Sequence, residues 1–380
     1  MEGRHQTVIK MKKWSLYIGS YAGIKVFIHW TFWIIIGWIF LMHYNMGHGL
    51  TEGLWGMLFI LALFGCVVLH EFGHALTAKR YNIKTRDITI YPIGGIASLE
   101  AMPEKPKQEL WVALAGPAIN VVIAAMLLIY LQYTGKVPDL SNLTAKVSDA
   151  HMFNLSFGFN LFAANLILAV FNLIPAFPMD GGRVLRALLA LTMDRSKATR
   201  IAATVGQSLA IAFVFFGFFY NFWLVFIGLF IYLGAGSEAA YESTKSVLSR
   251  YTARDVLMKQ FTCLPPEETL EKVVQLLLNG QEKEFVVAEN DKLLGILTRV
   301  ELIKGLSEYG KASTVSNAMR KDCIVLHLDM PLHEVYQKLM SNSCAVAPVL
   351  DNGVLTGIVD KENIDEFLLI ETALKRIDAA

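Results

Sequence analysis

Apolar residues gather in six long runs in the first two thirds of the sequence. Each run has about 20 residues, the number that an α-helix needs to cross the hydrocarbon core of a bilayer. The runs lie near 24–43, 54–76, 110–133, 155–177, 201–220 and 222–240. After Tyr241 the pattern changes to charged and alternating stretches. The sequence therefore predicts an all-α membrane bundle of six spans, followed by a soluble α/β region.

The composition agrees with this division and excludes one class of partner. Hydrophobic residues make up 54% of the chain and charged residues 18%, and the mean hydropathy is +0.44. A net charge of +1 gives no overall basic field, so nucleic acid is not an expected partner. The four cysteines lack the spacing of a metal site or a disulfide framework: Cys66, Cys263, Cys323 and Cys344.

The distribution of basic residues predicts the orientation. Lysines and arginines concentrate before the first run, after the second and after the fourth, whereas the opposite side receives only Lys136 and Lys146. Basic loops stay in the cytoplasm, so both termini are expected there. The N-terminus lacks the pattern of a removable signal peptide, and the first span is expected to act as an uncleaved anchor.

The stretch "LHEFGHAL" puts ionisable side chains inside the second apolar run. His70 and His74 are four residues apart, so in a helix both can bind one ion from the same face, and Glu71 can serve beside them as a proton acceptor. Ionisable groups at membrane depth are expensive and usually functional. The alternative is that the histidines hydrogen-bond between spans and only hold them together.

A catalytic zinc usually has three protein ligands and one water, so a third ligand is needed. Asp180, in "FNLIPAFPMDGGR", follows Pro175 and Pro178, which break the helix at the end of the fourth run. His70 lies about 16 residues, or about 24 Å, into a span that runs in the same direction as the fourth. Asp180 is therefore expected at a matching depth.

Three motifs, "HEFGH", "ALAGPAIN" and "NLIPAFPMDGG", occur in the order seen in the site-2 protease family, and residues 1 to about 240 resemble that family of intramembrane zinc metalloproteases. The resemblance implies one zinc bound by His70, His74 and Asp180, with Glu71 as general base and acid. It also implies that Asn172 holds the substrate or the developing oxyanion, as Asn120 also could. Hydrogen bonding between helices is the alternative for both asparagines.

The stretch "RDITIYPIGGIASLE", residues 86–100, alternates apolar and polar residues around Gly94 and Gly95. It predicts a β-hairpin between the second and third spans. In the family this region resembles a hairpin that dips into the membrane and pairs with an unwound substrate strand. A tight turn explains the two glycines equally well.

The last 140 residues contain an internal repeat with a period of about 61 residues, in which Met258 matches Met319 and Gly295 matches Gly357. Each unit predicts a strand, a helix, two strands and a second helix. The units resemble a tandem pair of cystathionine-β-synthase (CBS) domains. The predicted organisation is a membrane domain at 1–240, a linker at 241–250 and CBS domains at 251–310 and 311–380.

Paired CBS domains often bind adenine nucleotides, and the resemblance implies ATP or AMP near Thr298 and Glu301. Asp360 and Asn363 occupy the matching positions of the second unit, where the carboxylate of Asp360 would repel phosphate. A structural or dimerising role for the pair is the alternative.

Together these features predict a multi-pass zinc endopeptidase that cleaves within or near the transmembrane segment of a single-span membrane protein. The setting expected is a prokaryotic cytoplasmic membrane. Control is expected from the CBS pair or from a regulatory membrane protein, and a homodimer through the CBS domains is a further expected assembly. The alternative is an ion channel or transporter with regulatory CBS domains, in which Glu71 has no necessary role.

Overall fold

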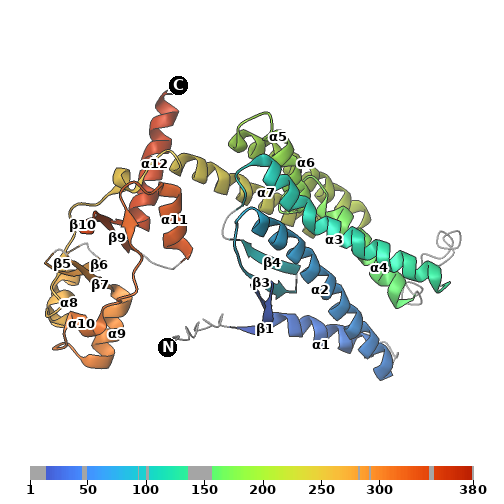
Figure 1. Ribbon diagram of the computed structural model, residues 1–380, viewed down its shortest axis with the longest axis horizontal. Helices are drawn as coiled ribbons and strands as arrows, with labels where there is room; N and C mark the ends of the chain where they lie inside the picture. The colour runs from blue at the N-terminus through green and yellow to red at the C-terminus, as the bar shows by residue number, and fades with distance from the viewer. Residues whose placement is uncertain are drawn as a thin grey trace. The chain divides into compact units, whose positions relative to one another are not determined.

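The computed structural model describes residues 14–44, 49–92, 94–99, 102–135, 156–280, 283–290, 292–341 and 346–378 (Figure 1). The chain divides into two compact units, Met1–Ala240 and Tyr241–Ala380. Each unit has its own buried core. They are therefore described separately.

The first unit is mainly helical and holds one small sheet. Its strands are β1 (Ser15–Tyr21), β2 (Ile24–His29), β3 (Thr85–Tyr91) and β4 (Gly94–Leu99). Its helices are α1 (Thr31–His43), α2 (Gly49–Arg80), α3 (Pro106–Tyr133), α4 (Phe157–Asn172), α5 (Asp180–Leu189), α6 (Arg195–Tyr220) and α7 (Trp223–Leu248), which ends in the second unit. Figure 1 shows α2, α3 and α4 running side by side, and they contact one another.

Four described helices are long and apolar enough to cross a membrane: Gly53–Arg80, Pro106–Tyr133, Arg195–Tyr220 and Trp223–Leu248. Two of the predicted spans correspond to shorter apolar helices, Thr31–Met42 and Phe157–Asn172. The count of six spans therefore stays a prediction.

The sequence predicts a single helix over the first apolar run, and this prediction is wrong. Its first residues form β2, which pairs with β1 through a turn at Ala22 and Gly23, whose φ angles are 54° and 86°. Positive φ angles suit a tight hairpin turn. Within β2, Ile24, Val26 and Phe27 are buried. An apolar segment can satisfy its backbone groups in a sheet as well as in a helix, and hydropathy alone does not separate the two.

The hairpin predicted around Gly94 and Gly95 is present as the antiparallel pair β3 and β4. It belongs to a larger sheet with the order β1-β2-β3-β4, in which β2 and β3 run parallel. Both β3 and β4 contact α2, and Ile88 and Ile90 of β3 are buried. The sheet thus presents β4 as an edge strand beside the helix that carries the HEFGH sequence.

The second unit has the predicted repeat of strand, helix, two strands and helix. The first copy comprises β5 (Cys263–Leu264), α8 (Leu270–Asn279), β6 (Glu284–Glu289), β7 (Lys292–Thr298) and α9 (Arg299–Tyr309). After the short α10 (Val315–Ala318), the second comprises β8 (Leu326–His327), α11 (Leu332–Ser341), β9 (Val346–Asp351), β10 (Val354–Asp360) and α12 (Lys361–Asp378).

Each copy forms backbone hydrogen bonds with the other at matching positions. Met258 bonds with Ile358 of the second copy, and Arg320 bonds in the same way with Ile296 of the first. Both contacts explain a repeated glycine. A Cβ on Gly295 would lie 2.6 Å from the carbonyl oxygen of Arg320, and one on Gly357 would lie 2.7 Å from that of Met258.

Candidate functional site

His70 and His74 lie one turn apart on α2, and both are buried. Their Nε2 atoms point to the same place and are 3.1 Å apart. A helix supplies this arrangement directly, because positions four apart lie on one face.

Asp180 reaches the same place from another part of the chain. The helix α4 ends at Asn172, and the segment with Pro175 and Pro178 leads to α5, whose first residue is Asp180. A Cβ on the next residue, Gly181, would lie 2.2 Å from the carbonyl oxygen of Ile174, so the turn requires glycine there. The proline and glycine pattern thus fixes the position of a carboxylate at a helix start.

The three side chains form a compact buried cluster, called here the metal cluster. Asp180 Oδ2 lies 3.2 Å from His70 Nε2 and 3.1 Å from His74 Nε2. The other carboxylate oxygen, Oδ1, is 3.8 Å from Arg183. No role was predicted for Arg183 from the sequence, although it directly follows Gly181 and Gly182.

The second nitrogen of each imidazole has a partner that sets the ring's protonation. His74 Nδ1 lies 2.7 Å from the carbonyl oxygen of Val112, which can only accept a hydrogen bond. His70 Nδ1 lies 2.5 Å from Asn120 Oδ1, which also only accepts. Both rings therefore donate from Nδ1, and each Nε2 carries a lone pair.

This cluster fits a zinc ion. Three atoms that can each offer a lone pair face one another at 3.1–3.2 Å. Two ligand atoms each about 2 Å from one tetrahedral ion lie about 3.3 Å apart, close to these separations. Imidazole nitrogen and carboxylate oxygen are also ligands that zinc accepts.

Gly116 of α3 leaves the space for an ion. A Cβ at this position would lie 2.2 Å from His74 Nε2 and 2.6 Å from His70 Nε2. The backbone of α3 thus forms one wall of the cluster. Any side chain at position 116 would fill the space beside this wall. Gly116 belongs to the "ALAGPAIN" motif, but the sequence alone predicted no role for it.

Glu71 lies next to His70 and is half-buried beside β4. A Cβ on Gly95 would come within 2.9 Å of Glu71 Cγ, so the glycine lets the edge strand approach this side chain. Gly94, at the start of β4, has a φ of 137°, which favours glycine. Within the described part of the chain, no hydrogen bond occupies the Glu71 carboxylate.

The two predicted asparagines have different surroundings. Asn120 is fully buried, and its amide bonds both His70 and Asn165, so its contacts are those of a residue that holds a ligand in place. Asn172 is half-buried at the end of α4, and its side chain bonds no described residue. Asn165 belongs to none of the three motifs, and no role was predicted for it from the sequence.

In the second unit, Thr298 and Glu301 contact each other. Thr298 is the N-cap of α9: its hydroxyl oxygen accepts from Val300 N at 3.3 Å and its hydroxyl donates to Glu301 Oε2. Asp360 does the same for α12, accepting from Asn363 N at 2.6 Å. Helix capping accounts for the residue types at these positions in both copies.

The surroundings of this pair are acidic. Burial of the Glu284 carboxylate, together with the nearby charges of Asp360, Glu301 and Glu362, raises the pKa of Glu284 from its ordinary value to about 7, against the opposing effect of Arg320. Such a field opposes the binding of highly charged phosphates.

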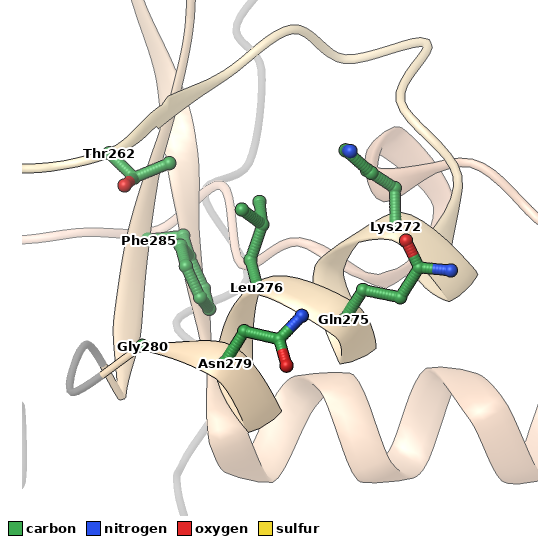
Figure 2. Close-up of a pocket in the computed structure, with 7 residues that line it drawn as sticks. All are labelled: Thr262, Lys272, Gln275, Leu276, Asn279, Gly280 and Phe285. Atoms are coloured by element: carbon green, nitrogen blue, oxygen red, sulfur yellow. The ribbon is translucent and has the colours of Figure 1, made fainter.

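A cavity of about 460 Å³ lies elsewhere in the second unit (Figure 2). It is lined by Thr262, Lys272, Gln275, Leu276, Asn279, Gly280 and Phe285. Figure 2 shows most of these side chains on α8, with Phe285 on the strand opposite. Neither Thr298 nor Glu301 lines it, so this cavity does not coincide with the predicted nucleotide contacts.

The chain is similar to several known proteins. The sequence matches peptidase family M50 over residues 58–216 and the CBS domain over 253–308 and 315–370. It is 33% identical to a zinc metalloprotease of Methanocaldococcus jannaschii over 92% of this chain and 95% of that protein. It is 26% identical to stage IV sporulation protein FB of Bacillus subtilis, over 73% and 84% of the two chains. A solved site-2 protease from Methanocaldococcus jannaschii is 35% identical and covers 59% of this chain and 95% of its own, with a TM-score of 0.43.

Proposed function

Because the chain belongs to peptidase family M50, the site-2 protease family, and is an integral membrane zinc metalloprotease, we propose that His70, His74 and Asp180 hold the zinc. The observation that carries this proposal is the set of three buried acceptor atoms that face one another at 3.1–3.2 Å. Only a cation or a proton can relieve that arrangement.

We assign general base and acid catalysis to Glu71. When bound, zinc supplies a Lewis acid that polarises the scissile carbonyl and makes a water molecule more acidic. The carboxylate of Glu71 takes the proton from that water and returns it to the leaving amine. Its position one residue after a metal ligand, without a competing hydrogen bond from a described residue, supports this role.

The substrate is proposed to bind as an extended strand. A peptide bond inside a transmembrane helix is protected until the helix unwinds, and an edge strand offers the freed backbone new hydrogen bonds. The edge strand β4 begins at Gly94, and Gly95 lies against Glu71. The Asn172 amide, which bonds no described residue, can donate to the substrate or to the developing oxyanion.

The proposed substrates are single-span membrane proteins cut within or near their spans. We propose six spans with both termini in the cytoplasm of a prokaryotic cell, because basic residues flank the predicted cytoplasmic ends. A regulatory membrane protein and a homodimer through the CBS domains are the proposed partners.

We propose that the CBS pair responds to an adenine nucleotide at Thr298 and Glu301. The acidic surroundings make AMP a better fit than ATP, since each further phosphate adds repulsion. The expected outcome is a change in cleavage rate with AMP that is weaker with ATP.

The test uses the purified full chain and a panel of single-span membrane substrates, with Glu71→Gln as the matched variant. Glu71→Gln preserves shape and removes only the base, so it should bind about one zinc per chain, as the unchanged protein does, and cleave nothing. Cleavage by both proteins would refute the role of Glu71. Absence of zinc from both would refute the metal cluster.

The channel or transporter alternative is not favoured. The relatives that cover most of the chain include one named as a zinc metalloprotease, and the family match spans all of the metal cluster. Glu71, which ion passage would not need, lies beside the cluster.

A further inference from the structure

A line of buried amides leads from α4 to the metal cluster. Asn165 of α4 and Asn120 of α3 are both fully buried. Asn120 Nδ2 donates to Asn165 Oδ1 at 3.0 Å, and Asn120 Oδ1 accepts from His70 Nδ1. Asn165 Nδ2 donates to the carbonyl oxygen of Leu161 at 2.8 Å and also lies 3.4 Å from Cys66 Sγ.

The backbone carbonyl at the end of this line sets its direction. A carbonyl oxygen can only accept, so Asn165 must turn its NH₂ group to Leu161 and its oxygen to Asn120. Asn120 must then turn its NH₂ group to Asn165 and its oxygen to His70. The oxygen can bond His70 only if Nδ1 carries the hydrogen, and this leaves the lone pair on Nε2.

We propose that Asn165 is a positioning residue for the metal centre: through Asn120 it fixes the tautomer and ring orientation of His70. This inference rests on the proposed zinc site. Outer hydrogen bonds of this kind orient metal-binding histidines, and their loss typically weakens metal binding about 10–100-fold. His74 needs no such line of amides, because the backbone carbonyl of Val112 accepts directly from its Nδ1.

The alternative is that the amides only hold α3 and α4 together. A matched pair of variants separates the two roles, because threonine and valine have the same shape. In Asn165→Thr the hydroxyl can donate to the carbonyl four residues earlier and accept from Asn120, whereas Asn165→Val can do neither. A second comparison adds Asn120→Asp to Asn165→Val, since a carboxylate can only accept and orients His70 without help.

The measurement is zinc affinity of the purified full chain, by competition with a coloured chelator, with the visible spectrum of bound Co²⁺ as an independent readout. Gel filtration shows that each variant is folded. Asn165→Val should weaken zinc binding about 10–100-fold, and Asn165→Thr should stay within about threefold of the unchanged protein. Addition of Asn120→Asp to Asn165→Val should recover most of the loss.

Equal zinc affinity in Asn165→Val and Asn165→Thr would overturn the inference, as would a double variant no better than Asn165→Val. If the unchanged protein itself bound no zinc, the proposed function would fail instead. Cys66→Ala is the control for packing: it removes the sulfur that contacts Asn165 but leaves the Leu161 carbonyl, so zinc affinity should not change.

Discussion

Two polar clusters with buried members lie in the membrane unit, and α5 contributes to both. The metal cluster takes Asp180 from the first residue of α5. The second, called here the ion cluster, takes Arg186 from the same helix and joins it to Glu109, Arg195 and Glu238. Arg186 donates to Glu109 at 2.8 Å and to Glu238 at 2.5 Å, and Arg195 donates to Glu109 at 2.6 Å.

The clusters differ in how their charges and hydrogens are matched. The ion cluster has two carboxylates and two guanidinium groups, so its formal charges cancel and each carboxylate lies against an arginine. The metal cluster has three acceptors and no donor among them. Burial of ionisable groups is therefore not sufficient to identify a binding site. The unmatched acceptors fit the proposed cation site, whereas the balanced cluster ties α3, α5, α6 and α7 together.

The largest expected effect is the loss of a metal ligand. Asp180→Ala leaves two imidazoles, fewer than the three protein ligands that a catalytic zinc usually has. Loss of a hydrogen-bond partner of a ligand weakens metal binding by up to about 100-fold, and loss of the ligand itself should weaken zinc binding more. Cleavage should be abolished. Metal content and cleavage are measured on the same sample. Asp194→Ala, which removes an exposed carboxylate from the start of α6, should keep its zinc.

The next effect tests the space beside α3. Gly116→Ala puts a methyl group 2.2 Å from His74 Nε2, where an ion would lie, so zinc affinity should fall at least about tenfold. Gly65→Ala on α2 is the matched control, because its added methyl meets no atom within 4 Å. Equal zinc affinity in both variants would show that the cluster does not bind metal at this wall.

The ion cluster should show the opposite pattern. Glu109→Gln removes a buried carboxylate that two arginines contact, and a buried charge left without its partner costs about 3–5 kcal/mol of unfolding free energy. The unfolding midpoint should drop while zinc per folded chain stays unchanged. Asp329→Asn, which breaks an ion pair whose side chains are 61% and 88% exposed, should change neither. A loss of zinc in folded Glu109→Gln would erase the distinction between the clusters.

The smallest effect concerns the second unit and pH. The pKa of Glu284 is raised from 4.5 to about 7, so the folded state holds this proton more tightly than the unfolded chain does. Its stabilising contribution is complete below pH 4.5 and is lost as pH rises through 7. Glu284→Gln cannot ionise, so the variant should melt higher than the unchanged chain at pH 8. No difference at pH 8 would place Glu284 in solvent.

Much of the metal cluster could be predicted from the sequence, because helix geometry makes the spacing of His70 and His74 meaningful and few acids lie in the spans. Asp180 was expected from the proline and glycine pattern around it. Asn165 could not be predicted, since the side chains that it contacts lie 45 and 99 residues away and no local pattern marks it. The strand β2 was missed because an apolar run does not show whether its backbone groups bond within a helix or within a sheet.

The proposed zinc site is tested by the zinc K-edge X-ray absorption spectrum of the purified full chain, measured beside that of His74→Ala. A zinc ion held by His70, His74 and Asp180 should show only nitrogen and oxygen neighbours at about 2.0–2.2 Å, with the signature of two imidazole rings, and His74→Ala should lose that signal. Sulfur neighbours at about 2.3 Å, or an unchanged spectrum in His74→Ala, would contradict it.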